Sequence, residues 1–138
     1  MPNYIIDIVN KQGQQVYTNP KEHLTIDAMR WFFSRYGMQK KHLAQDKNVL
    51  VTLVEYRDIK CWGECLEGKE YDYEISLATD QCLRDYLATL MHEMVHLRQW
   101  ERYRWSGDGE KEAEELQYKL ADDFWTCGII WFNRCCRI

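Results

Sequence analysis

Two histidines and a glutamate in one short stretch carry the clearest chemical signal in the chain. Residues 91–97 read Met-His-Glu-Met-Val-His-Leu, which places His92 and His96 four positions apart in a run with helical character. Side chains at i and i+4 lie on the same helix face, one above the other, so both imidazoles can bind one metal ion. Glu93 is then placed to take a proton from a metal-activated water. The spacing predicts a hydrolytic metal centre.

A catalytic zinc site needs a third protein ligand, with water in the fourth position. No histidine follows His96, so a ligand from further along the chain must be a carboxylate or a cysteine. The run Glu110-Lys111-Glu112-Ala113-Glu114 begins the next expected helix, after a turn that folds it back against the first. Glu110 and Glu112 are both candidates in that run, although Glu112 has Leu116 rather than an acid four residues later.

The two motifs together resemble the gluzincin metallopeptidases, whose second helix carries a Glu-x-x-Ala/Ser-Asp motif. The resemblance implies that Glu110 is the third ligand, that Ala113 is the small packing residue, and that Glu114 hydrogen-bonds a ligand histidine and fixes its tautomer. Small phage-encoded SprT-like proteins are similar in the order of elements, over residues 48–126, and in Gln99 three positions after the second histidine. SprT-like proteins usually use a third histidine, which this chain does not have downstream of His96, so their role on DNA–protein crosslinks transfers poorly.

This resemblance predicts a zinc-dependent metallopeptidase acting on a peptide or protein substrate. Glu93 would be the general base and would then pass its proton to the leaving amine. Tyr103 shares the histidine face and could steady an oxyanion, although a packed aromatic is its more common role. Each of these residues also has a simpler interpretation. The histidines could lie on the polar face of a surface helix. Glu110 could be a carboxylate that interacts favourably with the helix dipole, and Glu114 could lie on a solvated helix face.

Two other functions stay open. One is a non-catalytic binding module of the same fold that keeps the metal helix as a scaffold and binds nucleic acid through the arginines, which are Arg84, Arg98, Arg102 and Arg104. The other is a structural domain without metal. The net charge of −4 gives no overall basic field that would favour nucleic acid.

The expected fold is one α+β domain over residues 1–138, with a small mixed or antiparallel sheet packed on helices as in a minimal zincin-like core. Tyr4–Val9 predicts a strand, and Val49–Tyr56, apolar on both faces, predicts a central one. Residues 71–77 alternate, which predicts an edge strand with one wet face that could align a substrate by strand addition. Residues 58–69 predict a turn or a long hairpin.

Three helices are expected. Asn19-Pro20 predicts the start of the first and Gly37 its end. Thr79-Asp80 predicts the start of the histidine helix, whose apolar stripe should pack on the sheet and turn both histidines the other way. That stripe consists of Leu83, Leu87, Leu90, Met94 and Leu97. The third helix is expected from Glu110 to Thr126, and Gln14–Thr18 could return as a short strand.

No apolar run approaches the length of a membrane span, and the first residues lack the features of a secretory signal. We therefore expect a cytoplasmic protein, in the host cytoplasm if it is phage-encoded, and its six cysteines should mostly be buried thiols. A second metal site at Cys61 and Cys65, or at Cys135 and Cys136, is a weaker alternative because neither pair has zinc-knot spacing. The sequence does not fix an oligomeric state.

Overall fold

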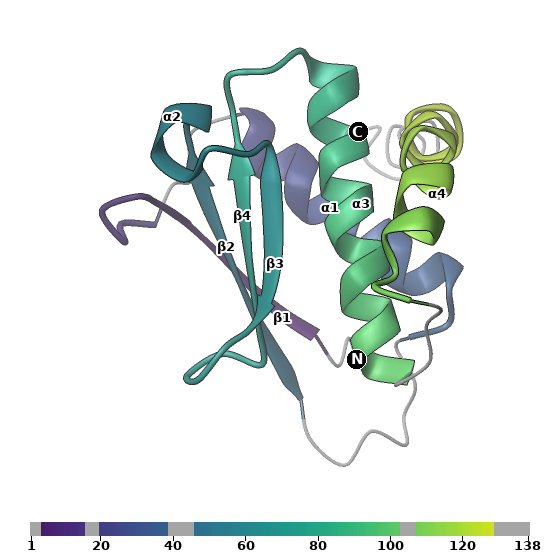
Figure 1. Ribbon diagram of the computed structural model, residues 1–138, viewed down its shortest axis with the longest axis horizontal. Helices are drawn as coiled ribbons and strands as arrows, with labels where there is room; N and C mark the ends of the chain where they lie inside the picture. The colour runs from purple at the N-terminus through teal and green to yellow at the C-terminus, as the bar shows by residue number, and fades with distance from the viewer. Residues whose placement is uncertain (1–3, 16–19, 39–45, 103–106, 129–138) are drawn as a thin grey trace, which may run out of the picture.

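The structure, a computed structural model of the chain, describes residues 4–15, 20–38, 46–102 and 107–128 (Figure 1). Its elements, in chain order, are β1 (Tyr4–Asn10), α1 (Pro20–Arg35), β2 (Lys47–Val54), α2 (Tyr56–Ile59), β3 (Gly63–Glu67), β4 (Tyr73–Ala78), α3 (Leu83–Arg102), α4 (Glu110–Asp123) and the π-helical turn η1 (Phe124–Gly128). The described chain is therefore α+β, with a four-stranded mixed sheet.

The sheet has the order β1-β2-β4-β3. The first three of these strands run parallel, and β3 is antiparallel to β4. The register places Ile8 beside Val51 and Val51 beside Ile75, and all three are buried. Side chains on the other face are more open, with Ile5 46% exposed and Leu66 53% exposed. The helices therefore cover mainly one face of the sheet, as the alternation of apolar and polar residues requires.

The alternation of residues 71–77 predicted an edge strand, and this prediction was wrong. β4 lies between β2 and β3, and the edge nearest the histidine helix is β3, in a segment expected to be a turn or hairpin. Alternation reports only that one face of a strand is buried, and an interior strand of a sheet covered on one face can show it as well as an edge strand. The sequence of β3, Gly-Glu-Cys-Leu-Glu, has little strand propensity, so its pairing depends on β4 rather than on its own residues.

The first helix and the central strand are confirmed by α1 and β2. After α1, Gly37 adopts a φ of 61°, which ends the helix. Phe33 of α1 is buried and stacks on Tyr4 of β1, with ring centroids 4.0 Å apart, which packs this helix onto the sheet. Of the possible strand after β1, the structure describes only a bridge between Val9 and Gln15, and residues 16–18 lie outside the described ranges.

The histidine helix begins at Leu83, later than its expected start. Asp80 does not cap it; its Oδ1 accepts a hydrogen bond from the backbone N–H of Tyr56, 2.8 Å away, and so ties the start of α2 to the end of β4. Leu83 is 37% exposed, so the buried stripe consists of its four later members: Leu87, Leu90, Met94 and Leu97.

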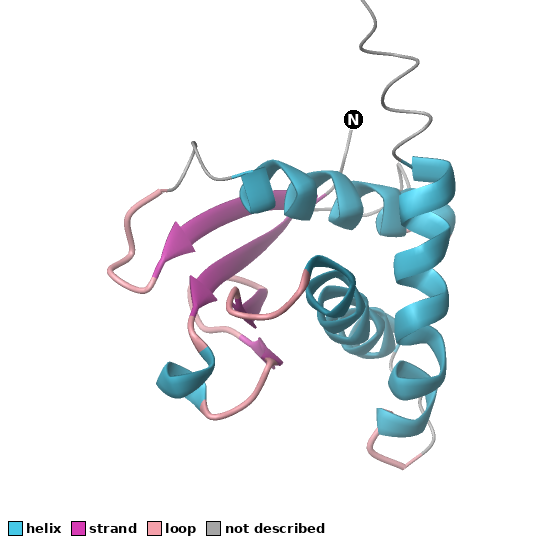
Figure 2. Cartoon of the chain, turned by 90° about the horizontal axis from the view of Figure 1, so that it is seen from above, coloured by secondary structure: helices cyan, strands magenta, loops and turns pink. Residues whose placement is uncertain are grey.

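α3 is the central element, since it contacts the sheet on one side and α4 on the other (Figure 2). Ala88 and Gln99 lie on the histidine side of α3 and are only 2% and 3% exposed, because α4 packs against α3 there. Further along α3, after the histidines, Glu101 accepts hydrogen bonds from Tyr4 and Tyr73. These bonds fix the end of α3 to β1 and β4. The histidine face therefore points toward α4 and not into open solvent.

Candidate metal centre

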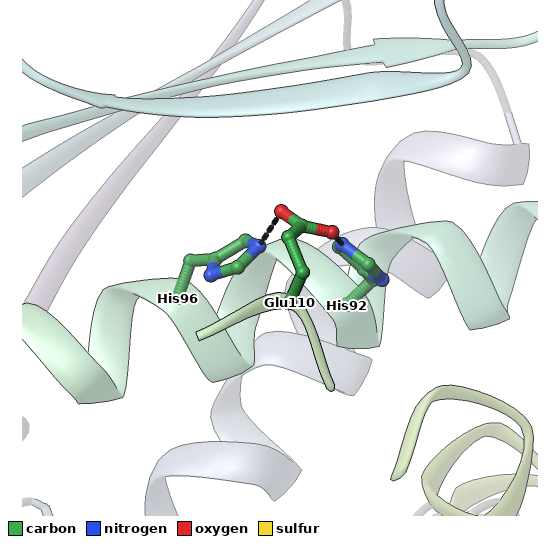
Figure 3. Close-up of side chains that lie close together, drawn as sticks. All are labelled: His92, His96 and Glu110. Atoms are coloured by element: carbon green, nitrogen blue, oxygen red, sulfur yellow. Dashed lines mark hydrogen bonds and ion pairs between the residues drawn. The ribbon is translucent and has the colours of Figure 1, made fainter. Parts of the chain in front are cut away.

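His92 and His96 of α3 and Glu110, the first residue of α4, meet in one cluster (Figure 3). Glu110 Oε2 lies 3.0 Å from His92 Nε2, and Oε1 lies 2.8 Å from His96 Nε2. One ligand atom from each of the three residues lies within 4.8 Å of the others. The structure thus joins the two rings predicted from the i, i+4 spacing with a carboxylate from the following helix, in a group that could hold a metal ion.

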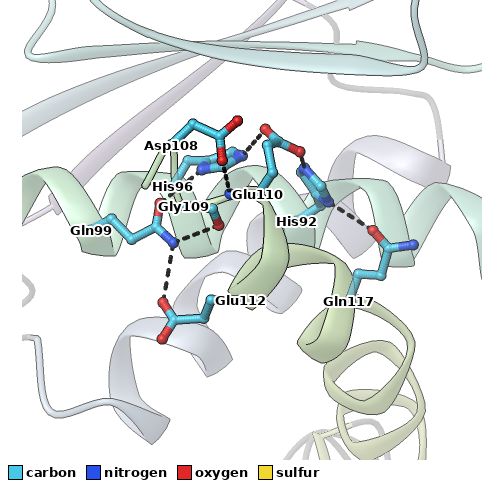
Figure 4. A network of polar contacts seen from close by, with 8 residues as sticks. All are labelled: His92, His96, Gln99, Asp108, Gly109, Glu110, Glu112 and Gln117. Carbon is cyan, nitrogen blue, oxygen red and sulfur yellow. Dashed lines mark hydrogen bonds and ion pairs between the residues drawn. The ribbon is translucent and has the colours of Figure 1, made fainter. Parts of the chain in front are cut away.

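Glutamines hold the other nitrogen of each ring (Figure 4). His92 Nδ1 is 2.7 Å from Gln117 Oε1, and His96 Nδ1 is 2.9 Å from Gln99 Oε1. The Gln99 amide has only one consistent orientation, because its Nε2 donates both to the Gly109 carbonyl at 3.0 Å and to a carboxylate at 3.1 Å. Its oxygen therefore faces His96, and His96 Nδ1 must be the donor.

This tautomer leaves an electrostatic conflict at the cluster. A neutral imidazole that donates from Nδ1 carries a lone pair on Nε2. In His96 that lone pair faces a carboxylate oxygen of Glu110 at 2.8 Å, so two acceptors point at one another. A cation between them, either a metal ion or an added proton on the ring, removes the conflict. The Glu110 side chain is 48% exposed, so it has room to move when such a cation binds.

The structure gives different surroundings to Glu110, Glu112 and Glu114, the glutamates of the predicted motif in α4. Glu112 is the carboxylate that accepts from Gln99, so it supports the ring of His96 from behind instead of facing the two Nε2 atoms. Glu114 is exposed and is not the partner of either Nδ1 atom, so the role expected for it falls to Gln117 and Gln99. Tyr103, the expected oxyanion stabiliser, lies outside the described residues.

The sequence motif did not predict Gln117 as a partner of a histidine ring, because it predicted an acid, Glu114, in that role. Gln117 stands seven positions after Glu110, two turns further along α4, and so lies on nearly the same helix face. The buried residues of α4, Ala113 and Leu120 among them, lie on that side, whereas Glu114 is on the solvent side. The i+7 spacing from the ligand was the signal that could have found Gln117.

A tight turn sets the position of Glu110. Gly109 has a φ of 80°, and Asp108 Oδ1 accepts a hydrogen bond from the Glu110 N–H at 3.0 Å. A Cβ atom on Gly109 would lie 2.1 Å from Gln99 Oε1, the atom that orients His96. The glycine therefore allows both the left-handed backbone and the close approach of the glutamine.

Gly109→Ala should destabilise the fold and weaken metal binding together. The left-handed backbone costs about 1–3 kcal/mol with a side chain, and the methyl group would also push Gln99 away from His96. Gly107→Ala is the matched control, since Gly107 has a φ of 61° but nothing within 4 Å of its Cβ position. Thermal melting and zinc titration of both variants would test this. Equal metal affinity in the two variants would contradict a role for the contact with Gln99.

Glu93 lies on the sheet side of the cluster and is 5% exposed. A Cβ atom on Gly63 of β3 would lie 3.4 Å from its Cγ, so the edge strand passes directly over it. Burial raises the pKa of the Glu93 carboxyl to about 7; charge on His92 and His96 opposes the rise, and Glu110 adds to it. A carboxylate with such a pKa beside a metal centre is suited to accept a proton near neutral pH.

A pocket of about 440 Å³ opens beside His92 and Glu93. It is lined by residues of α3 and α4 and by Trp62 and Gly63 at the start of β3. A volume within the range of roughly 300–1,000 Å³ found for small-molecule sites is large enough for a substrate side chain. The cluster therefore has an adjoining space on the His92 side.

The cysteines add no second metal site in the described part of the chain, where His92, His96 and Glu110 form the only group of three candidate ligands. Cys61 and Cys65 are free thiols, and burial raises the pKa of Cys65 well above its usual value. Such a thiol stays protonated and unreactive near neutral pH. The pair at 135–136 lies outside the described residues.

Comparison of the chain with models of known protein families, with curated proteins and with solved structures found no match. None of the helices that the structure describes is long and apolar enough to cross a bilayer. Any function assigned to this chain must therefore follow from its own residues and their geometry.

Proposed function

We propose that the protein is a zinc-dependent metallopeptidase with a minimal zincin-like core. The observation that supports the proposal most directly is the cluster of two histidine rings and one carboxylate, whose candidate ligand atoms lie within 4.8 Å of one another. His92, His96 and Glu110 would hold the zinc ion. Two imidazoles and a carboxylate, with a fourth position left for water, are a donor set that zinc accepts in hydrolytic enzymes.

Zinc, when bound, would lower the pKa of water toward about 7 and polarise a carbonyl group. The residues of the chain would do the rest. Glu93 would accept a proton from the attacking water and deliver it to the leaving amine, which its raised pKa makes feasible in both directions. Gln117 and Gln99 would keep the rings in the tautomer that presents Nε2 to the metal.

The substrate would lie along β3. Within the described part of the sheet this strand pairs only with β4, so its outer edge can add a peptide by backbone hydrogen bonding. β3 replaces residues 71–77 in this role, because β4 has strands on both sides. Gly63 brings the edge over Glu93, which would place a peptide backbone near the proposed base.

The nucleic-acid alternative gains no support from Arg84 and Arg98, whereas Arg102 is exposed at the end of α3. Arg84 donates to both carboxylate oxygens of Asp122, at 3.1 Å each, and Arg98 stacks on Tyr36 at 4.3 Å with its pKa lowered by burial. Guanidinium groups already paired in this way offer little to a phosphate backbone. Arg104 lies outside the described residues, and the alternative stays a prediction.

Metal removal tests the proposal directly. Protein purified without added metal should contain about one zinc ion per chain by elemental analysis. It should cleave an unfolded protein such as casein, lose that activity on treatment with a chelator, and regain it with zinc. Cleavage that continues after the metal has been removed would contradict the proposal. Protein without metal that binds none on titration would favour a purely structural domain.

A further inference from the structure

The pocket beside the metal cluster has a distinct chemical character. Its walls include Asp85 and Thr89 of α3, Tyr118 of α4 and Trp62 before β3, and it reaches Glu93 at the cluster. None of the described residues that line it is a lysine or an arginine. The described lining therefore combines acidic groups with aromatic rings, and the nearby Arg84 lies over the Tyr118 ring without lining the pocket.

Asp85 provides a carboxylate that makes no salt bridge within the described part of the chain. Tyr118 donates to its Oδ1 at 2.8 Å, and this hydrogen bond, followed by one from Cys82, holds the pKa of Asp85 below its usual value; the charge of nearby Arg84 also lowers it. Arg84, next in sequence, turns instead to Asp122. A carboxylate has about four lone-pair positions, so after these two hydrogen bonds Asp85 can still accept from a ligand.

The aromatic residues suit the aliphatic part of a long cationic side chain. Trp62 is 46% exposed and Tyr118 is 38% exposed, although both line a pocket. Trp62 is steadied by Tyr56, whose ring centroid lies 4.5 Å away. Both rings can contact methylene groups, and Trp62 can attract a cationic head group above its face, whereas the Tyr118 ring already has Arg84 over it at 4.6 Å.

We infer that this pocket binds the side chain of a lysine or arginine in the substrate, with Asp85 as the residue that selects its charge. That this ligand belongs to a substrate rests on the proposed peptidase function. Binding of a cationic side chain by the pocket can be tested independently of that function. The inference assigns a ligand class to the part of the pocket that extends away from His92 and Glu93, toward Asp85 and Trp62.

The direction of β3 indicates where the cationic residue stands relative to the cleaved bond. The pocket lies at the Gly63 end of the strand, where β3 begins. A peptide antiparallel to β3, the slightly more stable pairing, would run from the Glu67 end toward Gly63. It would pass the metal cluster first and the pocket next. The lysine or arginine would therefore follow the cleaved bond.

Binding of small probes tests the pocket independently of cleavage. N-acetyl-arginine amide and N-acetyl-citrulline amide have nearly the same shape but differ in charge, and Trp62 supplies a fluorescence signal. We expect the parent protein to bind the arginine probe roughly 10–100-fold more tightly, as hydrogen bonds to charged groups allow. Asp85→Asn should remove this preference while keeping an acceptor for Tyr118. Glu70→Gln, a matched loss of one exposed charge elsewhere, should keep it.

Cleavage of a mixed peptide library by the zinc-loaded protein completes the test. Product N-termini enriched in lysine and arginine, with the enrichment lost in Asp85→Asn, would support the inference. Cleavage without that enrichment would overturn it and leave the peptidase proposal standing. Cation binding that depends on Asp85, without cleavage of any peptide, would support recognition by the pocket and refute the peptidase. Equal binding of both probes by the parent protein would overturn the inference.

Discussion

Glu93→Gln should abolish peptide cleavage while leaving the metal bound. Glutamine has nearly the same size and fits the buried site, but it cannot take a proton from water. General-base catalysis contributes roughly 10²–10⁴-fold, so cleavage should fall by at least that factor. Glu93 is not one of the three clustered ligands, so zinc content by elemental analysis should match the parent. Glu115→Gln, an exposed carboxylate on α4, is the matched control and should keep full activity.

The stability of the variant without metal provides a second control with a defined sign. The pKa of Glu93 is raised from 4.5 to about 7 in the folded protein, mainly by burial. Its contribution to stability is therefore full below a pH of about 4.5 and is lost as the pH rises through about 7. Glutamine, which stays neutral, should not show this loss. Metal-free Glu93→Gln should melt at or above the parent at about pH 8, with the difference gone near pH 4.

Two results would contradict the role given to Glu93. Undiminished cleavage by the variant would show that another group takes the proton. A melting temperature well below that of the parent at about pH 8 would mean that the loss of cleavage reflects damage to the fold, because the physical argument requires the opposite sign.

The ligand cluster was predictable because its geometry is local. The separation of His92 and His96 is fixed by the pitch of one helix, and Glu110 follows after a short glycine-containing turn that limits where the next helix can begin. The strand Val49–Tyr56 was also predictable from its run of apolar residues, although only one of its faces is well buried: Leu50 and Thr52 on the other face are partly exposed. In both cases residues close together in the sequence were enough to predict the element, although the choice between Glu110 and Glu112 was left to the resemblance.

The edge strand β3 and the glutamines that hydrogen-bond the two histidines could not be predicted in the same way. β3 has few strand-forming residues and exists because β4 pairs with it and because Gly63 allows it to lie against Thr89. The burial of Gln99 depends on α4 covering α3, a contact between elements that neither helix specifies alone. The resemblance to the gluzincin motif predicted Glu114 as the partner of a ligand histidine, whereas the packing of α4 turns Gln117 toward the ring of His92.

Glu110→Gln should weaken zinc binding more than any other single change on α4. Loss of a residue that only orients a ligand typically costs 10–100-fold in metal affinity, and removal of the ligand itself should exceed about 100-fold. The variant keeps the size of the side chain but replaces a charged donor by a neutral amide. Competition with a chelating dye would give the affinities, and the visible spectrum of the cobalt-substituted protein would report whether the coordination remains tetrahedral.

Two neighbouring variants separate the possible ligands. Glu112→Gln should lower zinc affinity only by the smaller factor, since Glu112 contacts Gln99 and reaches the metal through His96. Glu114→Gln should leave it unchanged, because Glu114 is exposed and Gln117 holds the ring of His92. If Glu112→Gln lost the metal and Glu110→Gln kept it, the ligand would be Glu112 and the pairing seen at the two Nε2 atoms would be incidental.

Melting with and without zinc would show that these effects act through the metal. The Glu110 side chain is 48% exposed, so its contacts with the two histidines contribute little stability by themselves. Metal-free Glu110→Gln should therefore melt close to the parent. Zinc at about 100 times its dissociation constant should stabilise the parent by about 2.7 kcal/mol. The variant should gain almost nothing at the same concentration, because the carboxylate that completes the cluster is absent.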